Sequence, residues 1–181
     1  HRLRLAISTS YFPMIWTPPE PVTLTLHTGG SYLELPLREP SSLDETLSEF
    51  APAVSGPGIA KEVHEETKGF WRITEDAANG AVEIHLADGG GHFTFKDSDL
   101  TVYKQGYERY RVVHDDPASV GGEVEWEYRM SREDWSVRTH TSTQLTADKD
   151  HFIVKARMTA WEGEEIVHTE EWDERIPRHL V

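Results

Sequence analysis

The chain has 181 residues, no cysteine and a formal net charge of −14 at pH 7, and its length suits one domain or one domain with part of a second. The acidic charge disfavours nucleic acid and anionic membrane surfaces as partners, and the missing cysteines exclude disulfides, thiolate catalysis and thiolate metal sites. No segment approaches the roughly 20 apolar residues of a membrane span, and the first residues lack the apolar core of a signal peptide, so the sequence favours the cytoplasm without fixing the compartment.

Residues 1–37 contain three predicted strands, in which apolar and polar residues alternate as they do in a strand with one buried face. They are Arg2–Ile7, Val22–His27 and Tyr32–Leu37. A tight hairpin turn is expected at Gly29-Gly30, between the second and the third. The alternation begins at the second residue, without the loose polar leader that usually opens a domain.

A proline-rich loop, STSYFPMIWTPPEP at residues 8–21, joins the first two predicted strands. Its prolines disfavour a long helix or a paired strand. Rigid aromatic side chains are good contact groups for sugars or for another domain, and we therefore take Tyr11, Phe12 and Trp16 as a candidate domain-interface loop. The alternative is that this loop folds back over the apolar edge of the sheet.

Residues 38–69 have the composition of a linker, with one short helix predicted in the segment SSLDETLSEF. Ser42 is expected to cap this helix, with Glu45 three residues later, while Leu43, Leu47 and Phe50 share a face. The following stretch, APAVSGPG, interrupts regular structure.

Residues 70–181 predict an antiparallel sheet of about seven strands, because short turns separate consecutive strands and parallel pairs need long crossovers. The strand candidates are FWRIT (70–74), AVEIHLA (81–87), HFTF (92–95), LTVYKQGYERYRVV (100–113), EVEWEYRM (123–130), WSVRTHTSTQL (135–145), HFIVKARMTAW (151–161) and EIVHTEEWDERI (165–176). Asn79-Gly80 indicates a hairpin, Gly89-Gly90-Gly91 a turn, and Gly106 a bulge or bend.

The alternation within these strands predicts one buried apolar face and one wet face. The predicted core residues are Trp126, Tyr128, Val137, Phe152, Val154 and Met158, with Glu125 and Glu127 in solvent. The expected fold is all-β: an antiparallel β-sandwich or half-barrel with at most one short helix. In it, a curved sheet closes on itself or on the strands of residues 1–37.

The motifs of common catalytic and cofactor sites are missing. The nucleophile elbow G-x-S-x-G is absent, and GGSYL at residues 29–33 lacks its closing glycine. HEETK at residues 64–68 begins like the zinc motif H-E-x-x-H but supplies only one histidine. There is no phosphate-binding loop and no dinucleotide fingerprint, so no cofactor is expected.

Histidines and glutamates offer two weaker candidates for a metal or carboxylate site. Strand histidines such as His140 and His168 could bind zinc in cross-strand pairs, although isolated histidines that face water are commoner. Glu123, Glu125 and Glu127 line one strand face, but a glycosidase needs two carboxylates in different environments. We therefore assign no catalytic and no metal-binding residue.

Two parts of the sequence resemble a known family. The first thirty residues, HRLRLAISTSYFPMIWTPPEPVTLTLHTGG, resemble the late strands of the C-terminal β-domain in the cocaine-esterase and X-prolyl dipeptidyl-peptidase group of serine α/β-hydrolases. The stretch REDWSVRTHTSTQLTADKDHF and the final EEWDERIPRHLV are similar to the tail of the longer members, the acyl esterases. In that family an N-terminal α/β-hydrolase domain with a helical cap carries the Ser–Asp–His triad, and a jelly-roll β-domain packs on both. None of the triad motifs can be placed on this sequence.

The resemblance implies that the chain is a C-terminal piece of such a hydrolase, which would explain why it starts within a strand. Residues 1–37 would be the terminal strands of a truncated jelly roll, residues 38–69 a linker and residues 70–181 a β-sheet domain. Its expected role is non-catalytic: it would pack on its own missing N-terminal α/β-hydrolase domain, in a protein that hydrolyses esters or X-prolyl peptides.

Two further expectations concern partners and alternatives. Arg2–Ile7 and Val22–His27 are expected to pair with the sheet of residues 70–181 or with a second copy of the chain, which makes a homo-oligomer an option. The alternative functions are a free-standing ligand- or carbohydrate-binding β-sandwich and an independent enzyme with a metal or carboxylate site.

Overall fold

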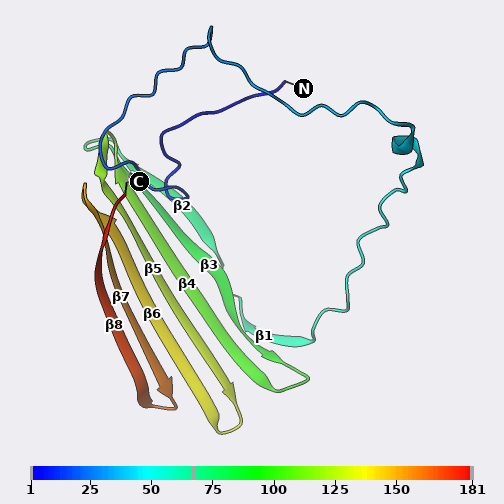
Figure 1. The fold of residues 1–181 in the computed structure, drawn as a ribbon. Helices are drawn as coiled ribbons and strands as arrows, with labels where there is room; N and C mark the ends of the chain where they lie inside the picture. The colour runs from blue at the N-terminus through cyan, green and yellow to red at the C-terminus, as the bar shows by residue number, and fades with distance from the viewer. Residues whose placement is uncertain (1, 67, 180–181) are drawn as a thin grey trace. The chain divides into compact units, whose positions relative to one another are not determined.

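The structure is a computed structural model that describes residues 2–66 and 68–179, and within them one short helix and eight strands (Figure 1). The elements are η1 (Ser42–Thr46), β1 (Lys61–Glu65), β2 (Phe70–Asp76), β3 (Ala81–Phe95), β4 (Leu100–Val113), β5 (Asp116–Arg132), β6 (Trp135–Ala147), β7 (His151–Glu162) and β8 (Glu165–Pro177). The predicted all-β, antiparallel class with at most one short helix is confirmed. In the described part of the chain, no helix is long and apolar enough to cross a membrane.

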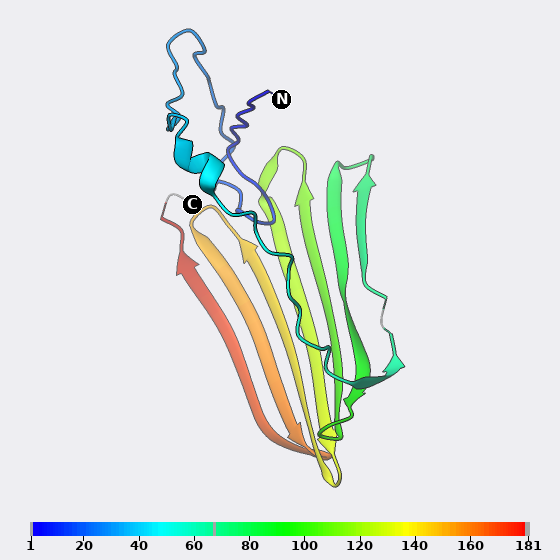
Figure 2. The same cartoon turned by 90° about the vertical axis from the view of Figure 1, so that its right-hand side faces the viewer.

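All eight strands belong to one antiparallel sheet, which Figures 1 and 2 show from two directions. From β3 to β8, each strand pairs with the next along the chain. The two halves of β3 have different outer neighbours, because β2 pairs with residues 81–87 and β1 with residues 92–95. The sheet is open, and β8 ends it with a strand whose 13 residues are all exposed.

The chain divides into two compact units. Residues 1–22 and 60–181 form the first, which contains the whole sheet, and Thr23–Ile59 form the second, which contains η1. The strands predicted at Arg2–Ile7, Val22–His27 and Tyr32–Leu37 are wrong, since no strand forms there. A strand needs a hydrogen-bonded neighbour to be stable, and the described residues give these segments none.

The predicted short helix exists, but its details differ by one residue. It is a 3₁₀ turn of five residues capped by Ser41, not Ser42, and Asp44 rather than Glu45 completes the reciprocal capping pair. Ser41 Oγ accepts from the Leu43 amide, and Asp44 Oδ2 accepts from the Ser41 amide.

A second correction concerns β1, because this strand lies inside the segment predicted to be a linker.

The hairpin predicted at Asn79-Gly80 is confirmed between β2 and β3. Gly80 takes a positive φ of 67°, which a residue with a side chain adopts at a cost. The Asn79 side chain donates to Asp76 Oδ2 at 2.7 Å and accepts from the Ala81 amide at 2.8 Å, so its amide group closes the turn on both sides.

The structure differs from two other predictions made at glycines. The run Gly89–Gly91 does not turn the chain, because β3 continues through it to Phe95. The register passes from Asp88 opposite Gly106 to Gly91 opposite Lys104, so β3 bulges by one residue there and β4 does not. Gly106 itself faces Trp126 in regular register, and a Cβ on it would lie 2.6 Å from the indole ring. Its lack of a side chain makes room for tryptophan.

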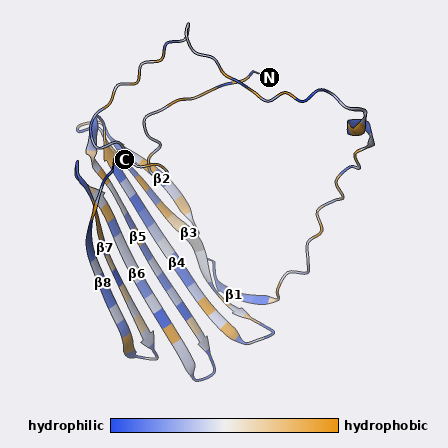
Figure 3. Ribbon diagram, viewed as in Figure 1, coloured by the Kyte–Doolittle hydropathy of each residue, from blue (hydrophilic) through white to orange (hydrophobic). Residues whose placement is uncertain are grey.

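The register gives the sheet two different sides. The apolar face carries the even-numbered residues 124–130 of β5, and the polar face carries the odd-numbered residues 123–129. Figure 3 shows the alternation between hydrophilic and hydrophobic residues along the strands. All six predicted core residues have their register positions on the apolar face, as expected.

The prediction that these six residues form a buried core is wrong. Each is partly or fully accessible, and Tyr128 is 39% exposed. Among the described residues, only Ala87, Val120 and Ala147 are buried hydrophobic side chains. A core needs two packed layers, and these residues form one sheet whose apolar face is largely uncovered.

Candidate functional site

The aromatic loop, Tyr11–Trp16, lies against one end of the apolar face. Phe12 makes an edge-to-face contact with Tyr110 of β4 at a centroid distance of 6.2 Å, and Trp16 makes one with Phe152 of β7 at 6.1 Å. Tyr11 is 68% exposed. Two of the three candidate interface residues therefore pack on the chain's own sheet, as the alternative for this loop expected, and the third remains accessible.

A buried arginine holds the segment after this loop. Arg178 donates from Nη2 to the Thr17 carbonyl at 2.5 Å and from Nη1 to the Asp148 carbonyl at 3.1 Å, with its guanidinium over the Phe152 ring. Thr17 Oγ1 in turn donates to the Pro117 carbonyl at 2.8 Å. Burial lowers the pKa of Arg178, while the nearby charge of Asp148 opposes this shift. The clamp, Thr17 with Arg178, joins segments from opposite ends of the chain.

Two ionisable groups near this end of the sheet have strongly shifted pKa values. The pKa of Asp148 is lowered to about 2, chiefly because its carboxylate accepts from the Asp150 amide, with further help from the His151 amide and from Arg175. The pKa of Tyr110 is raised to about 12 by burial and by its bond to Glu108 Oε2 at 2.6 Å.

The larger part of the apolar face is open to solvent. Trp71 and Ile73 of β2 are 71% and 66% exposed, and Met130, Trp172 and Ile176 also remain accessible. Their register partners place them on this same side of the sheet. These residues lie on one face of the sheet, from its β2 edge to its β8 edge. An exposed apolar surface of this kind is a candidate contact site. This surface is the first candidate functional site.

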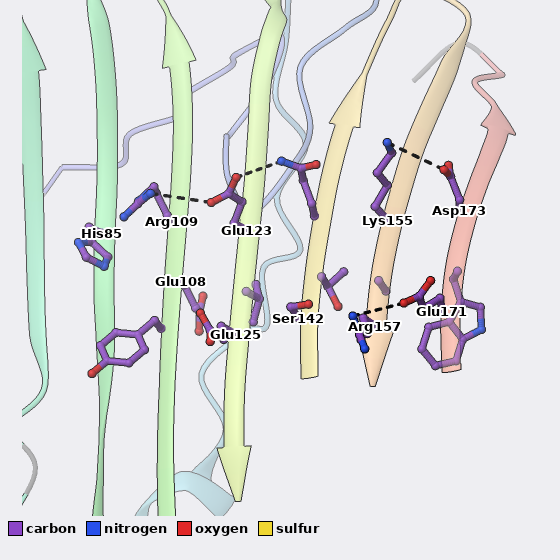
Figure 4. A pocket seen from close by; sticks show the side chains of 16 residues that line it. His85, Glu108, Arg109, Glu123, Glu125, Ser142, Lys155, Arg157, Glu171 and Asp173 are labelled. Carbon is purple, nitrogen blue, oxygen red and sulfur yellow. Dashed lines mark hydrogen bonds and ion pairs between the residues drawn. The ribbon is translucent and has the colours of Figure 1, made fainter. Parts of the chain in front are cut away.

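The second candidate is a cavity of about 560 Å³ on the polar face, which we call the polar groove. Two rows of side chains cross strands β4 to β8 and line it (Figure 4). The first row is Arg109, Glu123, Gln144, Lys155 and Asp173, and the second row is Tyr107, Glu125, Ser142, Arg157 and Glu171. Within each row, neighbouring residues are direct cross-strand partners, so the sheet register alone assembles the groove.

Ion pairs and hydrogen bonds connect the side chains of the first row. Glu123 accepts from Gln144 Nε2 at 3.0 Å and lies 3.9 Å from Arg109 Nη1. Lys155 Nζ lies 3.9 Å from the carboxylate of Asp173. These contacts are exposed, so each contributes little to stability, but together they set the direction in which the polar atoms point.

The second row is connected in the same way. Arg157 Nη1 lies 3.4 Å from Glu171 Oε1, and Glu125 pairs at 2.7 Å with His140 Nε2, which follows the row along β6. Tyr107 has no charge and is 44% exposed. The side chains of the groove therefore offer hydrogen-bond donors, hydrogen-bond acceptors and one aromatic ring.

The histidines and carboxylates considered for metal or acid–base chemistry do not come together as an enzyme site. Glu123 and Glu125 line the polar groove, but both carboxylates are exposed, whereas the general acid of a glycosidase lies in a desolvated pocket. The His64 ring lies 4.8 Å from the ring of His92, tilted by 53°, and its Nε2 contacts Thr94 Oγ1 at 2.7 Å. Among the residues that the structure describes, no group of three or more histidine or carboxylate side chains could hold a metal ion. The HEETK segment includes residue 67, which lies outside the described residues.

No protein-family model, no curated protein and no solved structure matches this chain.

Proposed function

We propose that this chain is the non-catalytic C-terminal β-domain of a serine hydrolase that cleaves esters or X-prolyl peptides, and that its apolar face packs on the α/β-hydrolase domain of the same protein. The observation that carries the proposal is the uncovered apolar face. Trp71 and Ile73 each keep about two thirds of their surface or more in water. Burying such side chains is favourable by about 25 cal/mol for each Å² removed from water.

The sequence supports a structural role rather than a catalytic one. It lacks the G-x-S-x-G elbow that exposes a serine nucleophile, and residues 1–30 resemble the β-domain rather than the catalytic domain of this hydrolase group. A domain without a nucleophile contributes by framing the substrate cleft and by holding the catalytic domain in place. Tyr11 would extend the same contact surface, because it projects from a loop whose other aromatic residues rest on the apolar face.

The reading frame upstream of residue 1 provides the first test. It should continue into an α/β-hydrolase domain with a nucleophile elbow. A frame that encodes any other kind of domain would overturn the proposal.

Cysteine labelling provides the second test, because this chain contains no cysteine. Ile73→Cys places a thiol on the apolar face, and Thr74→Cys places one at the next position, on the polar face. In the full-length hydrolase, a maleimide should react at least about tenfold more slowly at position 73 than in the isolated chain, and equally fast at position 74. Equal rates at position 73 in both proteins would contradict the proposal. Slow labelling of position 73 in the isolated chain at high concentration would assign the face to a homo-oligomer instead.

A further inference from the structure

We propose that the polar groove binds a neutral glycan chain. This site lies on the face opposite the proposed domain contact, so it is a separate function and not part of the packing on the hydrolase. Its side chains come from β4 to β8, within a single unit of the chain.

The dimensions of the groove suit an extended chain one sugar ring wide. Its two rows of side chains are two residues apart along each strand, which separates them by about 7 Å. Five adjacent strands at about 4.8 Å spacing make the groove about 19 Å long. The residues between the rows, such as Val124 and Ala156, direct their side chains to the opposite face, so main chain forms the floor.

The charges of the groove favour a hydroxyl-rich ligand without net charge. Its two rows hold three cationic and four carboxylate side chains, and ion pairs connect cations to carboxylates across the strands. A phosphate or another anion would approach the carboxylates of β5 and β8 as closely as the cations of β7. Hydroxyl groups both donate and accept, so they can bond to carboxylate, guanidinium and amide groups alike.

An aromatic cluster at one end of the groove provides the apolar contact that sugar rings make through their C–H faces. Tyr107 is 44% exposed, and its ring lies 6.5 Å from the ring of His85, which packs edge-on against Phe70 at 4.9 Å. His85 is visible at the β3 end of the groove in Figure 4. A tyrosine ring offers a flat apolar body with a hydroxyl tip, which suits a ligand that is apolar on one side and polar at its edge.

Native affinity electrophoresis of the full 181-residue chain tests this proposal. The probes are soluble neutral polysaccharides cast into the gel (mixed-linkage β-glucan, xyloglucan and galactomannan), with polygalacturonate as the anionic comparison. At least one neutral polymer should slow the wild-type chain, and 0.5 M NaCl in a matched solution assay should not abolish the binding. Tyr107→Ala should weaken this binding about tenfold, because it removes the aromatic contact at the β4 end of the groove.

Tyr128→Ala is the matched control, since Tyr128 has a similar exposure of 39% but lies on the apolar face. Its binding should equal that of the wild type. Gln144→Ala is a second groove variant, at an exposed position. Circular dichroism confirms that each variant is folded. The proposal is overturned if no neutral polymer slows the wild-type chain, if only polygalacturonate does, or if Tyr107→Ala and Tyr128→Ala lose binding equally.

Discussion

Gly106→Ala is the substitution for which the structure makes the most specific prediction. A Cβ added at Gly106 would lie 2.6 Å from two ring carbons of Trp126 and 2.7 Å from a third. A change in the position of the indole would disturb two contacts, because its ring is stacked on Tyr128 and lies 4.8 Å from Lys104 Nζ. Overpacking of this kind lowers stability by about 1–3 kcal/mol.

A smaller effect opposes this one, since replacing a strand glycine by alanine stabilises by about 0.5–1 kcal/mol when space is available. The net loss for Gly106→Ala should therefore lie between about 0 and 2.5 kcal/mol, which leaves it about 1–3 kcal/mol less stable than an alanine placed where space is available. Gly121→Ala is the control on the neighbouring strand, because a Cβ there would make ordinary contacts of 3.7 Å with Thr146 and 3.9 Å with the Leu145 carbonyl oxygen. It should leave stability unchanged or raise it slightly.

Urea unfolding followed by far-ultraviolet circular dichroism measures both variants, and a double-mutant cycle isolates the cause. In a Trp126→Ala background, Gly106→Ala should no longer destabilise the chain. The reasoning would be refuted if Gly106→Ala were as stable as Gly121→Ala, or if its cost were the same with and without Trp126.

Three further predictions follow from the clamp, from Asp148 and from the missing nucleophile. Arg178→Lys keeps the charge but loses the paired bonds to two carbonyls, so it should destabilise the chain by about 1.5–3 kcal/mol. An unchanged urea midpoint would contradict the clamp. The pKa of Asp148 is lowered from 3.8 to about 2 on folding, so its stabilising effect is complete above about pH 4 and disappears as the pH falls towards 2. The urea midpoint of Asp148→Asn should therefore change less than that of the wild type over this range, and parallel curves would rule this out. The isolated chain should not hydrolyse p-nitrophenyl acetate above a heat-denatured control, and turnover that a serine-directed phosphonate removes would disprove this.

Local signals predicted the β-sheet well. The period-two alternation identified nearly all of residues 70–176 as strands, and the Asn79-Gly80 pair identified a hairpin from two residues alone. These signals depend only on neighbours in the sequence, which is why the sequence by itself carries them. The same kind of signal failed where it needed a distant partner, as at Arg2–Ile7, whose alternation is that of a strand although no strand forms.

Two features could not be predicted from the alternation of apolar and polar residues: how far the apolar face is buried, and the role of Gly106. Both depend on contacts between residues that are distant in the sequence. Trp126 has the pattern of a core residue, but only a second layer would bury it, and the described residues form one sheet. A glycine within a predicted strand can mark a bulge or can make room for a large side chain on the next strand. Only the register distinguishes these two roles, and at Gly106 it shows the second.

The polar groove was not predicted from the sequence, although the sequence contains a signal for it. Arg132 pairs with Trp135 across a two-residue turn, which fixes the whole register of β5 and β6. That register places Glu123 beside Gln144. At the next turn Ala147 pairs with Phe152, which places Gln144 beside Lys155. Hairpin counting of this kind therefore predicts most of the first row of the groove from the positions of the turns alone.

The exposed edge strand β8 has a consequence for how this chain behaves at high concentration. An outer strand presents unpaired amide and carbonyl groups to which a strand of another molecule can add. Two copies that joined along β8 would bring Glu170, Glu171, Asp173 and Glu174 of one molecule against the same carboxylates of the other. Their mutual repulsion would oppose this pairing near neutral pH. This repulsion weakens in acid, because the carboxylates gain protons. An ordered aggregate would then start from strand β8.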